Sequence, residues 1–475
     1  MKSIPSVYMI GIVLVSFLCS FAIGMPPSQA LAQEEAINSS PAIDQMNILR
    51  SQNVDPEKNA AADFLRALGP NYGVPGEWRF AWETIEQSTE IPKGPFLELQ
   101  QTLQFKREKL NSLTTDFWMR DNEPDATKWI SNNLEPMQHI ANGLKKEQYF
   151  MPVGNGNAKQ PSIVADPLFF RELSRIGHLY TAKAMAHFGH GEFKRGLNEI
   201  HRLNRLGRKT GNGTQYEILR GYALCRNAAL AEWRLVFSGN PKREILETYI
   251  QYKSKLPTLP TISSCVPIET FFCKEILTLI KEGGFSDLKA TANLDLEIAF
   301  KEVDGYFTSI KSVFDLQAKG ITTLKGLEEV EANVKKPLPG IWSTKKLITR
   351  RLARKIIALV SLNWSKVLKG QLKSQTLIRL SNLAVRLKIH RLKYAAYPQE
   401  LNELEIDEKQ KFILTDPFSE APFIFKKTAT GYKIYSVSVN GKDDGGDGVG
   451  IQPSLDILKD DRADIGIEWV VPSKR

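Results

Sequence analysis

Three consecutive stretches decide the fold of the C-terminal part: Pro-Phe-Ile-Phe-Lys-Lys (422–427), Thr-Ala-Thr-Gly (428–431) and Tyr-Lys-Ile-Tyr-Ser-Val-Ser-Val (432–439). Two short apolar runs on either side of four residues that end in glycine are typical of a β-hairpin. A glycine-rich loop follows, Asn-Gly-Lys-Asp-Asp-Gly-Gly-Asp-Gly (440–448). Its amide and carboxylate oxygens are the ligands that a hard cation prefers. These residues predict a hairpin followed by a candidate ion-binding loop.

A long amphipathic helix precedes the hairpin. Between Gln371 and Lys393, leucine and isoleucine recur at three- and four-residue spacing, which predicts one buried face. The helix is expected to stop before Tyr397-Pro398, because proline cannot continue it. The basic residues of this segment are expected to point outward, and they are Lys373, Arg379, Arg386, Lys388, Arg391 and Lys393.

The order of these features resembles the globular part of type II secretion major pseudopilins, and of secreted bacterial proteins that carry such a tail. The resemblance rests on the long helix, a Leu-x-x-Leu turn and the hairpin, and covers roughly the last hundred of 475 residues. Its short motifs are Tyr397-Pro398, Leu401 and Leu404, Asp416-Pro417-Phe418, Tyr435-Ser436-Val437 and Asn440-Gly441. The hydrophobic assembly helix that begins a pseudopilin is missing, so the chain is not expected to form a pilus.

This resemblance implies a helix packed on a small antiparallel sheet, with calcium held in the loop after the Tyr-Ser strand. Carried over position by position, the calcium ligands fall on Asn440, Asp443, Asp444, Asp447 and Asp464, with backbone carbonyls near Val437. Asn440 replaces a carboxylate and Ser438 replaces a glycine of the family pattern, and residues 449–460 lengthen the loop. A bound calcium would be structural. The alternative is a solvated Asp/Gly turn without an ion.

The first residues are typical of a targeting segment. Lys2 is followed by an apolar run from Val7 to Ile23, and Ala30-Leu31-Ala32 offers a cleavage site. We therefore expect a signal peptide over 1–32 and a flexible leader over 33–54. The protein is then exported to the periplasm, the cell surface or the medium. The alternative is an uncleaved segment that anchors the protein in a membrane.

The remainder is predicted to be helical. Residues 55–255 are expected to form an α-helical domain that includes paired antiparallel helices, and residues 256–343 hold further helices and connectors. Residues 344–475 are expected to form a long basic helical region followed by the pseudopilin-like α+β module. Gly370 is the expected weak point of that helical region. The predicted fold class is mainly α with a C-terminal α+β module: a helical bundle or hairpin body, then a long helix packed on a small antiparallel β-sheet.

Composition supports a globular protein, with 42% hydrophobic and 24% charged residues. The mature chain keeps three cysteines, of which Cys265 and Cys273 are near enough in sequence to pair, whereas Cys225 is expected to be buried and inert. The net charge of +10 is uneven, because no Asp or Glu occurs from Ala332 to Gln399.

The densest basic patch of this acid-free stretch lies at its start. Such a patch suits an anionic membrane surface or an acidic envelope polymer. Export argues against nucleic acid as the natural ligand. The alternative is a solvated face that packs against acidic parts of the same protein. The patch comprises Lys345, Lys346, Arg350, Arg351, Arg354 and Lys355.

No familiar catalytic motif occurs. The chain lacks a Gly-x-Ser-x-Gly elbow, a Walker loop and a His-Glu-x-x-His signature. Paired carboxylates of a glycoside hydrolase leave no sequence signature and stay open. Candidate metal-binding histidines are His178, His187, His190 and His201, but surface histidines at helix ends are the more common explanation for such positions. Trp78, Trp82, Trp118 and Trp129 would line a sugar groove or, as is more common for helical stripes, lie in the core.

The first hypothesis is therefore a secreted or envelope-associated non-catalytic protein: a helical interaction platform with a pseudopilin-like, calcium-binding module. Its partner would be an envelope protein or polymer. One alternative is a hydrolase that acts on an envelope polymer or glycan. A pocket lined by two or three inward carboxylates and an exposed tryptophan would favour that enzyme. The other alternative is a peripheral membrane-binding protein that attaches through the basic helix.

Overall fold

The computed structural model describes residues 54–68, 107–151, 167–281, 294–316, 320–336, 338, 344–360, 363–428, 431–446 and 465–470. The predicted targeting segment and all but the last residue of the leader lie outside these ranges. Within them the protein is mainly helical, with one small antiparallel sheet near the C-terminus. The predicted fold class is therefore confirmed. No helix in the described ranges combines the length and the apolarity that crossing a bilayer requires.

The first helices form the body. They are α3 (Ala61–Leu68), α6 (Arg107–Thr115), α7 (Pro124–Asn132), α8 (Leu134–Lys145), α9 (Pro167–Gly189), α10 (Phe193–Thr210), α11 (Gln215–Ser238) and α12 (Arg243–Ser254). Then follow α13 (Val266–Lys281), α14 (Leu296–Leu316), α15 (Gly320–Lys335), α16 (Lys345–Val360) and α17 (Trp364–Tyr394). Short 3-10 helices are η1 (Pro56–Lys58), η3 (Arg120–Asn122), η4 (Ile262–Cys265), η6 (Leu401–Glu403) and η7 (Glu408–Leu414).

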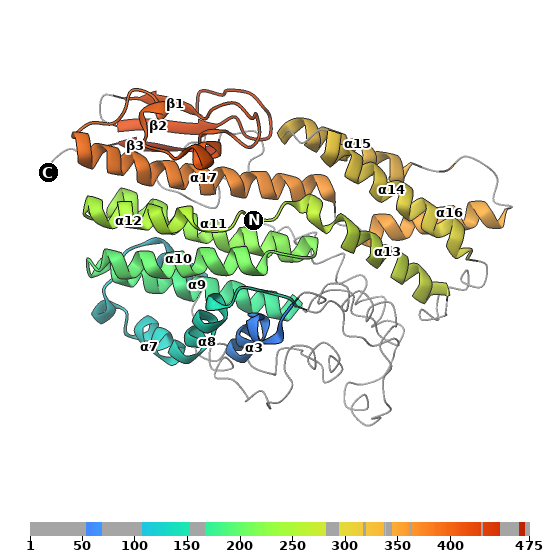
Figure 1. The fold of residues 1–475 in the computed structure, drawn as a ribbon, viewed down its shortest axis with the longest axis horizontal. Coiled ribbons are helices and arrows are strands. Elements are labelled where there is room, and N and C mark those ends of the chain that lie inside the picture. The colour runs from blue at the N-terminus through green and yellow to red at the C-terminus, as the bar shows by residue number, and fades with distance from the viewer. Residues whose placement is uncertain are drawn as a thin grey trace.

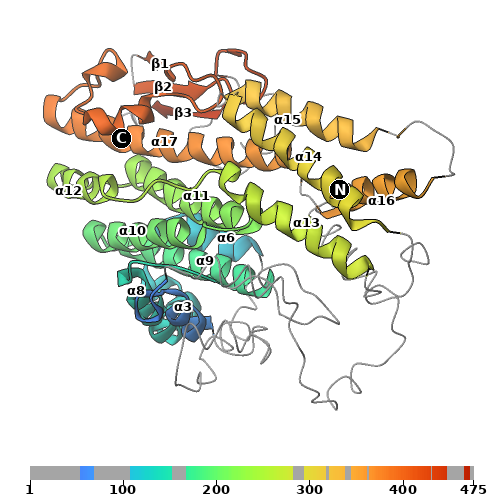
Figure 2. The same ribbon diagram turned by 45° about the vertical axis from the view of Figure 1, so that its right-hand side comes forward.

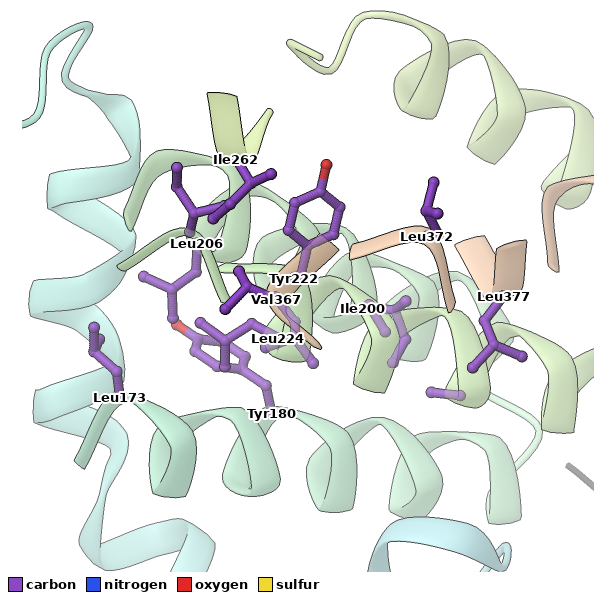
Figure 3. Close-up of a cluster of buried hydrophobic side chains, with 14 of the residues drawn as sticks. Leu173, Tyr180, Ile200, Leu206, Tyr222, Leu224, Ile262, Val367, Leu372 and Leu377 are labelled. Carbon is purple, nitrogen blue, oxygen red and sulfur yellow. The ribbon is translucent and has the colours of Figure 1, made fainter. Parts of the chain in front are cut away.

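The elements are stacked in layers (Figures 1 and 2). The sheet lies on α17, α17 lies on α11 and α12, and α10 and α9 follow, with α8 and α3 on the far side. Helices α13 to α16 extend from one end of this stack. Helix α17 thus contacts both the body and the C-terminal sheet, and one continuous buried cluster joins them. The close-up in Figure 3 shows part of that cluster, where Tyr222 of α11 stands between Ile262, Val367 and Leu372.

The predicted antiparallel helix pair is present, and glycine sets how closely α10 and α11 approach. A Cβ on Gly221 would lie 2.4 Å from the Gly207 carbonyl oxygen and 2.5 Å from the Gly211 Cα. These contacts are with backbone, so no side-chain movement relieves them. Thr214 begins α11 with a capping box, in which its hydroxyl accepts from the Glu217 amide and Glu217 accepts from the Thr214 amide.

The basic helical region differs from the prediction in two ways. It breaks before Trp364, where the Asn363 side chain caps α17 by accepting from the Lys366 amide, and it does not break at Gly370. Three basic residues expected to point outward are instead buried, namely Lys373, Arg386 and Lys388. They are covered because segments that precede α17 and segments that follow it in the chain both pack against this helix. The long aliphatic stems of such side chains cover apolar surface, while their polar ends find partners.

The sheet contains β1 (Ile424–Lys427), β2 (Gly431–Ser436) and β3 (Ile465–Val470) in the order β1-β2-β3. The predicted hairpin is confirmed, with Phe425 opposite Ile434. Strand β3, which the sequence analysis did not identify, pairs antiparallel with β2 and places Ile467 opposite Ile434. The sheet is tied to the preceding loop by the buried Asp416 carboxylate. Asp416 accepts from four donors: the amides of Phe418 and Val437 and the hydroxyls of Ser419 and Ser436.

The suggested pairing of Cys265 with Cys273 is wrong, because all three cysteines of the described chain are buried free thiols. Burial raises the pKa of the Cys225 thiol to about 11, which agrees with an inert role. Trp118 and Trp129 lie in the core, whereas Trp78 and Trp82 lie outside the described residues.

Candidate functional site: a groove between helices 12 and 17

The loop predicted to bind calcium is a tight turn held by its own hydrogen bonds. The Asp443 carboxylate accepts from the Tyr435 hydroxyl at 2.9 Å and from the Gly445 amide at 2.9 Å. These bonds favour the charged form and hold the pKa of Asp443 below its usual value. The Asn440 amide donates to Asp444 at 2.6 Å, and its oxygen accepts from the Lys442 amide. The structure therefore brings Asn440, Asp443 and Asp444 onto one turn.

The five predicted ligands fit a cation only in part. Asp443 and Asp444 supply carboxylates from neighbouring positions, which suits calcium. Asn440 turns its NH2 group towards Asp444, whereas a ligand has to present oxygen. Asp447 and Asp464 lie outside the described residues. Within the part of the chain that the structure describes, no group of three or more His, Cys, Asp or Glu side chains is arranged to hold a metal ion.

The predicted basic patch divides into two halves. Arg350 and Arg354 both pair with Glu302 of α14, and Arg351 donates to the Leu338 carbonyl at 3.1 Å. The other half, Lys345, Lys346 and Lys355, is exposed. The arginines thus fasten α16 to neighbouring parts of the protein, and the three lysines are the part of the predicted patch that stays exposed.

The histidines do not gather into one site. His187 contacts Glu192 at 2.6 Å, and both contact the Arg120 guanidinium, while His190 accepts from the Arg120 amide. This cluster joins the turn between α9 and α10 to η3. Burial lowers the pKa of His187, the hydrogen bond to Glu192 opposes that shift, and the net direction is down. His201 lies apart against Tyr252, and burial lowers the pKa of His178.

A groove of about 640 Å³ lies where the body meets the C-terminal module. Helix α12 forms one wall, the C-terminal half of α17 forms the floor and second wall, and residues 404–410 close the third side. Apolar groups from each element alternate with polar ones. The lining residues are Glu247, Ile250, Gln251, Ser254, Arg386, Ile389, His390, Lys393, Tyr394, Leu404, Glu405, Ile406, Asp407 and Gln410.

The walls of the groove are fixed by internal bonds. Arg386 donates to the Glu405 carbonyl at 2.8 Å, to the Gln410 side chain at 2.5 Å and to Asn382 at 2.9 Å, so it holds residues 405–410 against α17. On the rim Lys393 pairs with Glu405. That contact lowers the pKa of the Glu405 carboxyl, so Glu405 stays ionised. The groove therefore has its shape without a ligand.

Two aromatic rings stand at the mouth. Tyr394 is 53% exposed, and the His390 ring lies 4.7 Å from it between centroids. His390 donates through Nδ1 to the Ala396 carbonyl, which fixes the orientation of its ring. An exposed aromatic ring beside polar side chains of fixed position suits the binding of a partner with both apolar and polar surface.

Sequence reasoning did not find this groove, although a signal for it was present. Gln375, Arg379, Asn382, Arg386, His390 and Lys393 follow one another at three- and four-residue spacing, which places them along one face of α17. That polar stripe is bordered by the buried leucines that were used to predict the helix. A polar stripe beside an apolar one indicates a face that other segments cover incompletely.

Comparison of the chain with protein-family models, with curated proteins and with solved structures finds no match.

Proposed function

We propose that this chain is an exported, non-catalytic envelope protein, which binds an envelope protein or polymer in the groove between α12, α17 and residues 404–410. The observation that carries the proposal is the groove itself. It joins the helical body to the C-terminal module and has a volume of about 640 Å³, within the range of ligand-binding clefts. Its aromatic mouth and its internally bonded walls reduce the entropy lost on binding.

A hydrolase is the second candidate, because three carboxylates line the same groove: Glu247, Glu405 and Asp407. A glycoside hydrolase needs one carboxylic acid with a raised pKa, which donates a proton to the leaving group. Lys393 lowers the pKa of Glu405 instead. Glu247 is bonded to Arg243 at 3.3 Å. These pairings favour binding over proton transfer.

The test measures binding and turnover on the same samples. The purified mature protein is titrated with soluble peptidoglycan fragments by calorimetry, and the recovered fragments are sized by chromatography. Tyr394→Ala should raise Kd roughly three- to tenfold, since an aromatic contact contributes about 0.5–1.5 kcal/mol. Tyr252→Ala is the matched control, because Tyr252 of α12 is similarly exposed (47%) and does not line the groove.

Two results would overturn this proposal. Fragments that are shortened by the wild type and left intact by Asp407→Asn would establish the hydrolase. Equal losses of affinity in the Tyr394 and Tyr252 variants would place the binding surface elsewhere. A binding protein is supported if the fragments stay intact and only Tyr394→Ala loses affinity for them.

The proposal includes a structural calcium ion in the loop after β2. Asp443 and Asp444 would hold it, and Asn440 would have to turn its oxygen inward. When bound, calcium would bridge carboxylates that would otherwise repel one another, and this would pin a long loop to the sheet. What supports this part is the position of the two carboxylates on a turn where Gly441, Gly445 and Gly446 have positive φ.

A further inference from the structure

A second cleft, of about 470 Å³, lies on the other side of η7 from the groove and shares no lining residue with it. It opens between η4, the start of α15, the N-terminal half of α17 and residues 412–420. Phe314, Leu368, Leu372 and Phe412 supply apolar surface. Its size suits a small molecule.

The polar group that distinguishes this cleft is the half-buried guanidinium of Arg379. One nitrogen donates to the Thr415 carbonyl at 2.7 Å, and the group lies 5.5 Å from the centre of the Phe412 ring. No carboxylate of the described chain lies within ion-pair distance of it. Its remaining nitrogens are not among the buried polar atoms that lack a partner, so solvent reaches them through the cleft.

The nearest acidic groups do not neutralise Arg379. Asp416 is 1% exposed and directs its carboxylate towards four other donors. Glu420 stands exposed on the rim, where water and salt screen its charge. Burial lowers the pKa of Arg379 without making a guanidinium neutral at physiological pH. A positive charge with an open hydrogen-bonding edge therefore faces an enclosure with apolar walls.

We propose that this cleft binds an amphipathic organic carboxylate, with its oxygens on Arg379 and its aliphatic body against Leu368, Leu372 and Phe314. A guanidinium edge matches the geometry of a carboxylate and can donate two parallel hydrogen bonds. The hydroxyls of Thr261 and Ser263, which also line the cleft, are hydrogen-bonded to each other at 2.7 Å, and the one that accepts keeps its proton as a further donor. The site lies apart from the groove, so it stands whether or not the proposed function does.

The experiment titrates the purified mature protein with decanoate, decan-1-ol and decyltrimethylammonium at pH 7.5 and measures Kd by calorimetry. Decanoate should bind at least tenfold more tightly than the other two probes. Arg379→Gln should raise the decanoate Kd tenfold or more and leave that of decan-1-ol unchanged. Arg391→Gln is the matched control. Arg391 also bonds a neighbouring oxygen and lies over an aromatic ring, that of Tyr397, but it is outside the cleft.

A second variant keeps the test decisive if Arg379→Gln fails to fold. Glu420→Gln changes only an exposed rim residue, and it should lower the decanoate Kd two- to fivefold because it removes a repelling charge. Three results would each overturn the inference: no saturable decanoate binding, an equal effect of the Arg379 and Arg391 variants, or weaker decanoate binding in Glu420→Gln. Tyr394→Ala should leave decanoate binding unchanged, which separates this site from the groove.

Discussion

Replacement of Lys253 by methionine tests what holds the two walls of the groove in place. Lys253 of α12 pairs with Glu232 of α11, and the two side chains are 4% and 0% exposed. The Glu232 carboxylate also accepts from Tyr249 of α12, from Ser381 of α17 at 2.5 Å and from Asn204 of α10 at 3.3 Å. Four helices thus meet at one buried carboxylate, and α12 and α17 are the walls of the groove.

The magnitude follows from the burial of this pair. Methionine preserves most of the volume of the lysine stem. The decrease in the free energy of unfolding therefore reports on the unpaired charge that remains at Glu232. Removing one partner of a buried ion pair costs about 3–5 kcal/mol. Lys255→Met is the control, since Lys255 is exposed two residues away and its replacement should change stability by less than about 0.5 kcal/mol.

Equilibrium unfolding in urea, followed by circular dichroism, measures both variants. The Glu232→Gln/Lys253→Met double variant should recover about half of the lost stability or more, because the amide oxygen still accepts from Tyr249, the amide NH2 can donate to the Ser381 hydroxyl, and the unpaired charge is gone. The reasoning would be refuted if Lys253→Met cost no more than Lys255→Met. It would also fail if the double variant were less stable than Lys253→Met alone.

Three further predictions concern the helix crossing, a buried acid and the loop. Gly221→Ala should destabilise the protein by several kcal/mol in urea unfolding, because the added Cβ would overlap the Gly207 carbonyl. Gly305→Ala is the control: the added Cβ meets open space, so this change should stabilise the protein by about 0.5–1 kcal/mol. Burial raises the pKa of Glu269 from 4.5 to about 7. The folded state therefore keeps a proton that the unfolded state has lost, and this contribution to stability is present below pH 4.5 and is lost as pH rises to about 7. Glu269→Gln should match the wild type near pH 5 and exceed it by up to about 3 kcal/mol at pH 8 in urea titrations at both pH values. The Tm of the wild type should be higher in calcium than in a chelator, and this difference should vanish in Asp443→Ala/Asp447→Ala. Identical wild-type melting curves in calcium and in chelator would contradict calcium binding.

Features encoded by neighbouring residues were predictable from the sequence. Glycine and proline mark the ends of α9 and α17, and the β1–β2 hairpin surrounds a four-residue segment that ends in Gly431. Strand β3 was missed because it pairs with β2 across a long insertion, although Ile465, Ile467 and Trp469 alternate as a strand requires. The start of α17 carried a local signal too, since Asn363 is a favoured capping residue, while Gly370 is tolerated inside a packed helix.

The polar stripe on α17 marks a face of that helix, but the sequence does not tell which segments line the groove and the cleft, because those segments are far apart in the chain. Glu247 and Glu405 share one lining, and so do Thr261 and Asp416. The helical pattern predicted that Arg386 points into solvent, because water normally hydrates a cationic side chain. Residues 405–410 fold back over it and supply a carbonyl and an amide oxygen in place of water. Such a long-range contact leaves no trace in local spacing.

The cations of the acid-free stretch from 332 to 399 find their partners in other segments of the protein, and several of these partners are backbone carbonyls. Arg351, Arg379 and Arg386 each donate to a backbone carbonyl, those of Leu338, Thr415 and Glu405. A cation that is bonded to a carbonyl needs no carboxylate nearby, and an added acid would compete for its hydrogen atoms. The basic stretch therefore joins α16 and α17 to the segments around them. A residue that makes only one such bond and faces a cavity, as Arg379 does, is where the same chemistry becomes available to a ligand.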